Sequence, residues 1–384
     1  MAPILPPELE EAIMNFLVDH PDALRACALA CRSWLATSRM VLFRKITIES
    51  ETQFDAFEKA AISSPFIQEC VRILRIDRST QGYKLNYPWV NSKLSPILPK
   101  QLKRLHAFEL VKVEERWKVK SFSSLAEFRN VTKLSIISCG MSPAELYYLI
   151  GAFPSLNDLW IEHFVELFSG HLQLDQNSPS FLPTQHLTRL TLLAENLPHG
   201  CEDDFFRRIL ATSSESLREL TIAVGKRDLS SRTRFISSFG SSLQHLDVRF
   251  VRLLGQMGSD DPGLVNSFDL AANTGLRSLT LPYPSIPVVF PLLSQVAAPH
   301  LERINFRKQI YTLEELDRID HIALERDLQT AFKSNLRTVK EVRISYVSKL
   351  DHDAVLEKLS KAFPALTSRR MLRVVREYER QVPI

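Results

Sequence analysis

One short apolar pattern recurs along most of the chain, and it constrains the fold more than any other feature. The pattern has an apolar residue at its first, fourth and sixth positions and recurs about every 30 residues from Val71 to Ile344. Ten segments carry it, and their first residues are Val71, Leu102, Val131, Leu156, Leu187, Leu217, Leu243, Leu276, Leu301 and Val339. A quasi-regular repeat of this length is typical of a stack of similar structural units.

The spacing inside each segment predicts a short strand. The fourth and sixth positions lie on one face of a strand, and the third, fifth and seventh lie on the other. One such strand buries too little surface to be stable, but strands stacked in parallel bury a continuous apolar row. Between the strands we expect helices near residues 143–153, 202–210, 232–239, 287–297, 313–332 and 353–363. The sequence therefore predicts an α/β solenoid with parallel strands on a concave face and helices on a convex face.

The repeat resembles the leucine-rich-repeat family over roughly residues 66–366. The resemblance implies a solenoid of about ten rungs, which we place at residues 49–366. In that family the ninth position is usually Asn or Cys, and it ties neighbouring rungs together through backbone hydrogen bonds. Only Cys139 clearly matches that position here, so we expect an irregular stack.

Residues 1–48 lack the repeat and are predicted to form three short helices and a strand. Pro6 and Pro7 favour a first helix start and Pro21 a second one, and residues 44–48 read as a strand that leads into the repeats. The first helix carries an apolar stripe at helical spacing, formed by Leu9, Ile13, Phe16 and Leu17. A module of about 45 residues is marginal as an independent domain. Its apolar residues therefore need either the solenoid or a partner.

The same residues, in this order and spacing, carry a second resemblance. They are Leu5-Pro6-Pro7-Glu8-Leu9, Ile13, Leu17, Pro21-Asp22-Ala23-Leu24, Cys27-Ala28-Leu29-Ala30-Cys31-Arg32-Ser33-Trp34 and Leu42-Phe43-Arg44. Together they resemble an F-box, which docks on the Skp-type adaptor of an SCF ubiquitin ligase and, through it, on a cullin. An F-box followed by leucine-rich repeats is a common pairing, especially among fungal proteins.

The resemblance implies that the chain is the substrate-recognition subunit of an SCF-type E3 ubiquitin ligase. It implies that the adaptor is contacted by Leu5, Pro6, Leu9, Ile13, Leu17 and Leu24. Alternatively, these residues form the core of the module, and the protein is a leucine-rich-repeat interaction scaffold with a structural F-box-like module and no ligase role. We expect Trp34 to serve internal packing in either case.

A protein target of the solenoid is expected on the strand residues of its concave face. The candidate target contacts are Arg75, Arg104, His106, Trp160, Arg189, Asp247, Arg303 and Arg343. Trp160 stands out because tryptophan and arginine dominate interface hot spots, although a loop over residues 164–183 is an alternative cover for it. Eight basic and six acidic residues occupy the third, fifth and seventh positions. An acidic or phosphorylated target is therefore favoured only weakly.

The motifs of common enzyme classes are absent from the sequence. It has no Walker-type phosphate loop, G-x-S-x-G elbow, H-E-x-x-H motif or paired C-x-x-C. Residues 199–204 hold His, Cys and acidic side chains, but consecutive loop residues rarely converge on one metal ion. The acids of this segment also fit a helix start, where the helix dipole favours negative charge. We therefore expect no enzymatic activity, no metal and no cofactor.

Composition indicates a cytoplasmic or nuclear protein without a membrane or nucleic-acid partner. The net charge is only +4, well below what dedicated nucleic-acid binding usually shows. Five cysteines and no recognisable signal peptide favour a reducing compartment. No apolar run approaches the roughly 20 residues that span a bilayer.

The C-terminal residues 367–384 are rich in arginine. Met371, Val374, Val375 and Tyr378 follow helical spacing. We therefore expect a basic helix that caps the last rung, because solenoids need a polar terminal cap. A partner-binding basic helix is the alternative.

Overall fold

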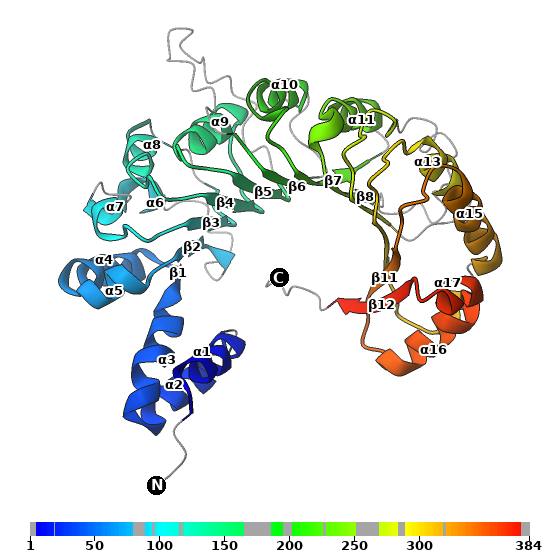
Figure 1. The fold of residues 1–384 in the computed structure, drawn as a ribbon. Coiled ribbons are helices and arrows are strands. Elements are labelled where there is room, and N and C mark those ends of the chain that lie inside the picture. Colours follow the sequence, from blue (N-terminus) through cyan, green and yellow to red (C-terminus); the bar gives the residue numbers. More distant parts are fainter. Residues whose placement is uncertain are drawn as a thin grey trace. The chain divides into compact units, whose positions relative to one another are not determined.

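The computed structural model describes residues 5–18, 20–79, 89–93, 97–114, 117, 119–164, 186–194, 202–225, 228–250, 269–282, 289–317 and 320–377. Over these residues, twelve strands follow one another in chain order in a single sheet with parallel pairing (Figure 1). The predicted α/β class with parallel strands is therefore confirmed. The chain divides into two compact units, which are Met1–Trp160 with Phe164–Gln185 and Ile161–His163 with His186–Ile384.

The first unit begins with the three expected helices and the strand after them. These elements are α1 (Pro7–Phe16), α2 (Pro21–Ala30), α3 (Arg32–Arg44) and β1 (Lys45–Ile48). Helices α1 and α2 both begin at a proline, whose fixed φ suits the first helical turn. The later elements are α4 (Glu51–Ser63), α5 (Pro65–Cys70), β2 (Ile73–Asp77), α6 (Trp89–Lys93), α7 (Ile97–Gln101), β3 (Ala107–Val111), α8 (Val119–Leu125), β4 (Lys133–Ile137), α9 (Pro143–Gly151) and β5 (Asp158–Glu162).

The second unit continues the alternation of strands and helices. Its elements are β6 (Arg189–Leu193), α10 (Glu202–Ser213), β7 (Glu219–Val224), α11 (Leu229–Ser237), β8 (His245–Phe250), β9 (Ser278–Pro282), α13 (Val289–Gln295), β10 (Arg303–Gln309), α14 (Glu314–Asp317), α15 (His321–Ser334), β11 (Glu341–Val347), α16 (His352–Ala362), α17 (Pro364–Ser368) and β12 (Leu372–Glu377). Each expected helix has a counterpart. The expected helix over 313–332 is two shorter helices, α14 and α15.

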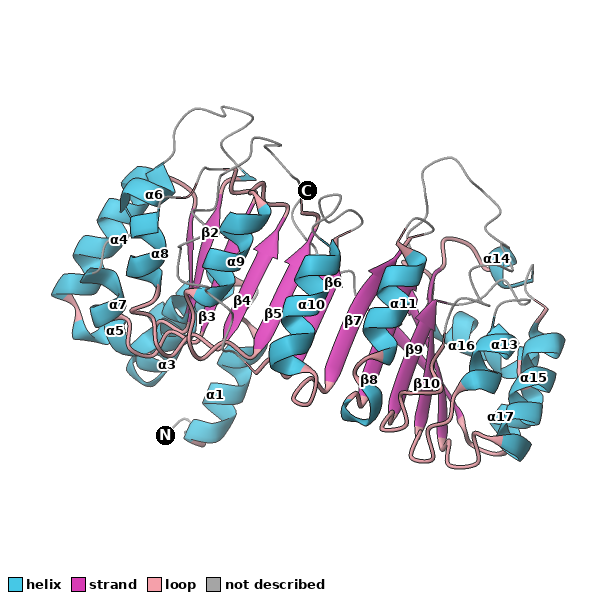
Figure 2. Ribbon diagram, turned by 90° about the horizontal axis from the view of Figure 1, so that it is seen from above, coloured by secondary structure: helices cyan, strands magenta, loops and turns pink. Residues whose placement is uncertain are grey.

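From α4 onward, the helices of each unit lie over one face of the strands (Figure 2). The fourth and sixth positions of the repeat point to this face and are buried, as Leu134 and Ile136 are in β4 and Leu220 and Ile222 are in β7. The predicted alternation of buried and outward-facing residues is therefore present. The other face of the strands, which carries the third, fifth and seventh positions, is called the strand face below.

One backbone hydrogen-bond pattern repeats from strand to strand. The carbonyl oxygen at the second position accepts from the N–H groups at the second and third positions of the next repeat. Thr132 O accepts from Asn157 N at 2.9 Å and from Asp158 N at 3.0 Å. Arg218 O in the second unit accepts in the same way from Gln244 N and His245 N. This pattern sets the register of each repeat.

The register corrects the assignment of the second repeat. Arg72 O accepts from His106 N and Ala107 N, and Ile73 pairs with Ala107. The first position is therefore Leu105 and not Leu102. Both leucines are buried, and both begin segments that match the apolar pattern, so the sequence alone did not separate them. The prediction that Arg104 and His106 occupy the strand face is wrong, because both precede β3.

The expected helix over residues 367–384 is also wrong within the part that the structure describes. Leu372–Glu377 form β12, which pairs in parallel with β11. Val374 and Val375 are β-branched and suit a strand, and the edge of β11 supplies the backbone partners that a strand needs. The strand therefore adds a rung beyond the ten predicted repeats, as β1 does before them. Residues 378–384 lie outside the described residues.

Side chains just ahead of the strands tie neighbouring repeats together. Asn130 Nδ2 donates to Lys103 O at 2.6 Å, and Ser216 Oγ donates to Leu187 O at 2.9 Å. Thr338 Oγ1 donates to Leu301 O at 2.9 Å. Cys139, the one match to the ninth position, is fully buried, and burial raises the pKa of its thiol to about 12. The ties expected at the ninth position are thus found mainly at the turns before the strands.

Asn335 makes the most extensive of these ties. Its Nδ2 donates to Leu293 O and Val296 O, both at 2.8 Å, and to Ser294 O at 3.3 Å. We expect Asn335→Ala to lower the free energy of unfolding of the second unit by about 2 kcal/mol, because the carbonyl groups at the end of α13 that accept from Asn335 then lose this donor. Urea denaturation measures this loss. Thr330→Ala is the control, because Thr330 is exposed and its hydroxyl donates within its own helix, to Arg326 O. Equal losses in the two variants would contradict the role given to Asn335.

Candidate functional site

Helix α1 has two apolar faces. Met14 is fully buried and packs with Leu24 and Val41 in a small core of the N-terminal helices. At 100° per residue, Leu9, Ile13 and Phe16 lie on the opposite side, where they are 52%, 39% and 84% exposed. The four residues of the predicted stripe therefore do not share one environment. Leu17 packs against the core with Met14, and the other three are exposed. We call Leu5, Leu9, Ile13 and Phe16 the outer stripe, since all four are exposed on this side of α1 or just before it.

A polar contact fixes the rotation of α1 against α3. Glu10 is buried, and its Oε1 accepts from Trp34 Nε1 at 3.1 Å and from Ser33 Oγ at 3.3 Å. Trp34 also packs against the core around Met14, as expected from the sequence. With Glu10 and Met14 held inward, the outer stripe must face away from α3.

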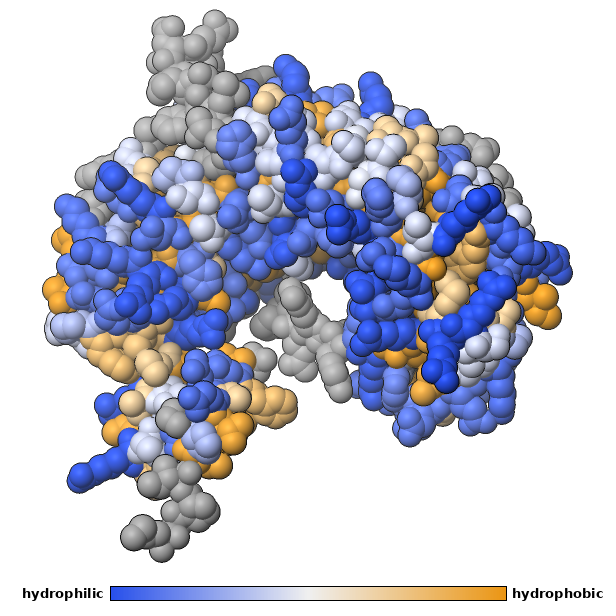
Figure 3. Space-filling view, in the orientation of Figure 1, coloured by the Kyte–Doolittle hydropathy of each residue, from blue (hydrophilic) through white to orange (hydrophobic). Residues whose placement is uncertain are grey.

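The six residues expected to contact an adaptor therefore have different environments. Leu5, Pro6, Leu9 and Ile13 are exposed. Leu17 is half-buried against the core, and Leu24 is only 1% exposed. Leu24 is a core residue, which was the alternative interpretation. Apolar surface gathers on this helical module in Figure 3. The exposed apolar side chains of the module that lie outside the predicted set are Phe16, Val18, Leu29 and Met40. Phe16 was detectable from its spacing of seven residues after Leu9.

The strand face of the first unit is a network of paired charges. Arg75 Nη2 lies 2.6 Å from Asp77 Oδ2, and Lys45 Nζ lies 3.0 Å from Glu109 Oε2. Burial raises the pKa of Asp77, but hydrogen bonds from Ser79 and Arg75 outweigh burial and hold the pKa below its usual value. These charges are committed to partners within the sheet.

Trp160 lies on β5 and is half-buried. Lys133 Nζ is 6.0 Å from the centre of its ring and 3.7 Å from Asp158 Oδ2. The three side chains therefore form a mixed aromatic and charged group on the strand face, which is the position expected from the sequence. The loop considered as its cover falls largely in residues 165–185, which lie outside the described residues.

The strand face of the second unit also carries paired charges. Arg189 Nε lies 2.7 Å from Glu219 Oε2, and Arg307 Nη1 lies 2.7 Å from Asp247 Oδ2. Arg303 and Arg343 share one carboxylate, that of Glu341. Six of the eight residues expected to contact a target therefore lie on the strand face, and they are Arg75, Trp160, Arg189, Asp247, Arg303 and Arg343. Arg307, which reaches across β9 to Asp247, was not among the residues expected from the sequence to contact a target.

The two residues displaced by the corrected register have other environments. Arg104 Nε lies 2.7 Å from Glu69 Oε2. His106 is half-buried ahead of β3, and burial together with nearby arginines lowers the pKa of its ring. Neither residue is therefore retained as a contact on the strand face.

The pair of Arg189 and Glu219 gives a test of the strand-face electrostatics. The hydrogen bond from Arg189 holds the pKa of Glu219 below its usual value. We expect Arg189→Gln to raise that pKa toward the value of a free glutamate, as measured by NMR titration of the Glu219 carboxyl carbon. Because the folded-state pKa is lowered, the pair contributes stability at neutral pH and loses it as pH falls through that pKa. An unchanged pKa would contradict the pairing, and Arg218→Gln, on the preceding exposed residue, is the control.

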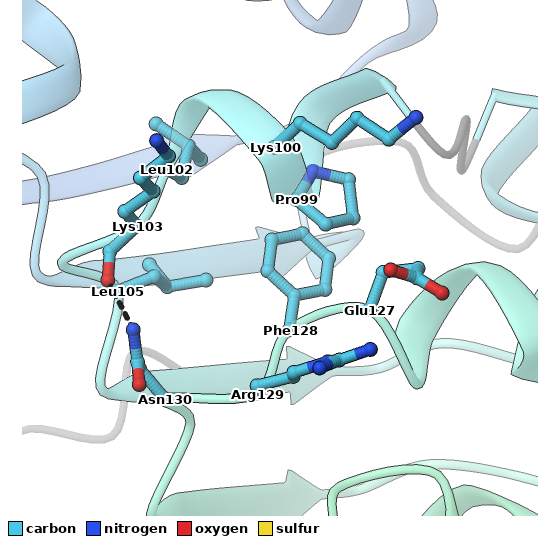
Figure 4. Close-up of a pocket in the computed structure, with 9 residues that line it drawn as sticks. All are labelled: Pro99, Lys100, Leu102, Lys103, Leu105, Glu127, Phe128, Arg129 and Asn130. Carbon is cyan, nitrogen blue, oxygen red and sulfur yellow. Dashed lines mark hydrogen bonds between the residues drawn. The ribbon is translucent and has the colours of Figure 1, made fainter.

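A shallow hollow of about 210 Å³ lies in the first unit near the ends of α7 and α8 (Figure 4). Phe128 and Pro99 form much of its wall, and Lys100 and Arg129 stand at its edge. Ligand pockets usually occupy 300–1,000 Å³. The Asn130 amide in its wall is already bonded to Lys103 O. The hollow is therefore smaller than a typical small-molecule pocket.

Within the part of the chain that the structure describes, no group of three or more His, Cys, Asp or Glu side chains could hold a metal ion. Residues 199–201 of the segment considered for metal binding lie outside that part. No helix among the described residues is long and apolar enough to cross a membrane.

A scan against models of known protein families finds no match for this chain, and a search of the curated proteins finds no similar sequence. Two surfaces remain as candidates for function. They are the outer stripe of α1 and the strand face.

Proposed function

We propose that this protein is the substrate-recognition subunit of an SCF-type E3 ubiquitin ligase. In this proposal the N-terminal helices are an F-box that binds a Skp-type adaptor, and through it a cullin. The strands and helices that follow are a leucine-rich-repeat solenoid whose strand face binds a protein target. The receptor catalyses nothing, and it accelerates ubiquitin transfer by holding the target near a charged enzyme.

The outer stripe is the observation that carries the proposal. A module with its own core around Met14 does not need Leu9, Ile13 or Phe16 for its fold. Exposed apolar residues gathered on one helix face mark interaction sites, because their burial by a partner is favourable by about 25 cal/mol per Å². A purely structural module would be supported by burial of Leu9 and Ile13, but both are exposed.

The repeating register supports the solenoid part of the proposal. The same backbone acceptor recurs at the second position, and small polar side chains tie successive turns. Such stacks present long surfaces for binding other proteins. The paired charges and Trp160 on the strand face suit recognition of a protein, since aromatic and arginine side chains supply most interface energy.

Co-purification tests the proposal. The full chain, tagged at its C-terminus, is expressed together with a Skp-type adaptor and recovered by its tag. We expect the adaptor in near-equimolar amount and, with a cullin added, a ternary complex. Recovery of the folded chain without adaptor would overturn the ligase role.

A further inference from the structure

The strand face carries no excess of positive charge except at its last three strands. In the first unit, three basic side chains, Lys45, Arg75 and Lys133, lie with four acidic ones, Asp77, Glu109, Asp158 and Glu162. Strands β10, β11 and β12 instead carry four arginines and two glutamates on this face, namely Arg303, Arg307, Arg343, Arg373, Glu341 and Glu377. Positive charge is therefore in excess on the strand face of β10, β11 and β12.

Two of these arginines oppose each other. Arg343 and Arg373 are register partners on β11 and β12, so their Cα atoms are about 5 Å apart. Arg343 donates to Glu341 at 2.9 Å, and Arg303 shares that carboxylate at 3.3 Å. Arg373 is exposed and has no ion-pair or hydrogen-bond partner among the described residues. The Glu341 carboxylate thus serves two guanidinium groups and Arg373 has no carboxylate partner in the described part of the chain, so the like charges of Arg343 and Arg373 repel at this spacing.

The surroundings leave the arginine tips accessible. The neighbouring strand-face positions hold Asn305 and Ser345, both buried and bonded to each other through Ser345 Oγ and Asn305 Oδ1 at 2.9 Å. Because these side chains are short, they form a floor and do not cover the guanidinium groups. The Arg303 side chain is 43% exposed and that of Arg343 is 25% exposed.

We propose that Arg303, Arg343 and Arg373 bind an anionic segment of a partner protein, with a phosphate ester or two adjacent carboxylates placed between Arg343 and Arg373. Both groups offer several oxygen acceptors at about −2 charge, which matches the excess of positive charge here. This inference rests on the proposed function only in that the partner is then the ligase target. Four arginines interspersed with two glutamates suit a short anionic segment better than a long nucleic-acid backbone, which needs a continuous basic track.

Fluorescence anisotropy with three labelled peptides tests the inference. They share one Gly-Ser sequence, in which two serines are unmodified, phosphorylated, or replaced by pairs of glutamates. We expect the full chain to bind the phosphorylated or the glutamate peptide at least tenfold more tightly than the unmodified one. Preference between the two identifies the source of the anion.

A matched pair of double variants locates the site. Arg343→Gln with Arg373→Gln is expected to weaken anionic-peptide binding at least tenfold, since charge-assisted hydrogen bonds are lost. Removing the repulsion should leave this variant at least as stable as the wild type. Arg207→Gln with Arg234→Gln, which alters exposed arginines on α10 and α11 of the same unit, should bind as the wild type does.

Three outcomes would overturn the inference. They are equal binding of all three peptides, an equal loss in both double variants, and a single-stranded RNA oligonucleotide that binds more tightly than either anionic peptide. Adaptor co-purification is measured on the same proteins. Adaptor binding without peptide binding refutes only the arginine site, and peptide binding without adaptor binding refutes only the ligase role.

Discussion

Replacing Leu9 and Ile13 together by glutamate is expected to abolish binding of a Skp-type adaptor while leaving the fold intact. Both side chains lie on the outer stripe, so the charged replacements are solvated in the free protein. In a complex they would be buried without partners, which costs several kcal/mol for each charge. We therefore expect an affinity loss of more than a hundredfold in a binding titration, with an unchanged unfolding midpoint.

Two comparisons make this result specific. Ile62→Glu with Ile322→Glu places the same charges at other exposed apolar positions and should bind the adaptor normally. Leu24→Ala should weaken binding by a different route, because Leu24 belongs to the core of the module. Its loss should appear as a drop of about 2–5 kcal/mol in the stability of the N-terminal helices. Normal adaptor binding by the folded Leu9 and Ile13 variant would show that the outer stripe is not the docking surface.

Replacing Arg232 by methionine is expected to cost the second unit about 3–5 kcal/mol of stability, because it breaks a buried ion pair from one side. The Arg232 side chain has no exposed area. Its Nε lies 2.7 Å from Glu202 Oε1, Nη2 lies 3.4 Å from Asp228 Oδ2, and Nη1 donates to Ala223 O. The residue thus joins the start of α10, the strand β7 and the helix α11. Methionine keeps the apolar stem and removes every one of these contacts.

The loss at Arg232 should depend on pH. Burial raises the pKa of Glu202, and Arg232 opposes that rise. Without Arg232 the pKa of Glu202 rises further, so the carboxylate becomes neutral at a higher pH and the unpaired charge disappears. Denaturation should therefore show a smaller difference between wild type and variant as pH falls below that pKa. Arg234→Met is the control on the same helix, since Arg234 is exposed. A similar loss in both variants would remove the special role of the buried arginine.

Much of the fold was predictable because the apolar repeat is a local signal. The fourth and sixth positions mark the buried face of each strand, and nine of the ten assigned segments start where the register puts them. The one segment that was misplaced is the second along the chain, because Leu102 and Leu105 lie three residues apart and both are buried. Strand β12 was missed because a helical spacing and a strand alternation coexist in residues 371–378, and only the free edge of β11 decides between them.

The sites were less predictable, because they depend on which face of an element is already occupied. Leu9 and Leu24 look alike in sequence, but the packing of Met14 and the bond from Trp34 to Glu10 leave one outside and the other inside. Arg307 contacts Asp247 and Glu377, which lie 60 and 70 residues away along the chain. It reaches them across β9 and β11, whose intervening residues Pro282 and Ser345 are small. No spacing rule in the sequence encodes such contacts.

The central claim is that the outer stripe of α1 docks on an adaptor. Amide hydrogen exchange of the full chain, with and without a saturating purified Skp-type adaptor, tests it most directly. We predict slower exchange in α1 and α2 on addition of the adaptor and unchanged exchange in β3 to β11. Unchanged exchange in α1, or slowing confined to the strands, would contradict the account.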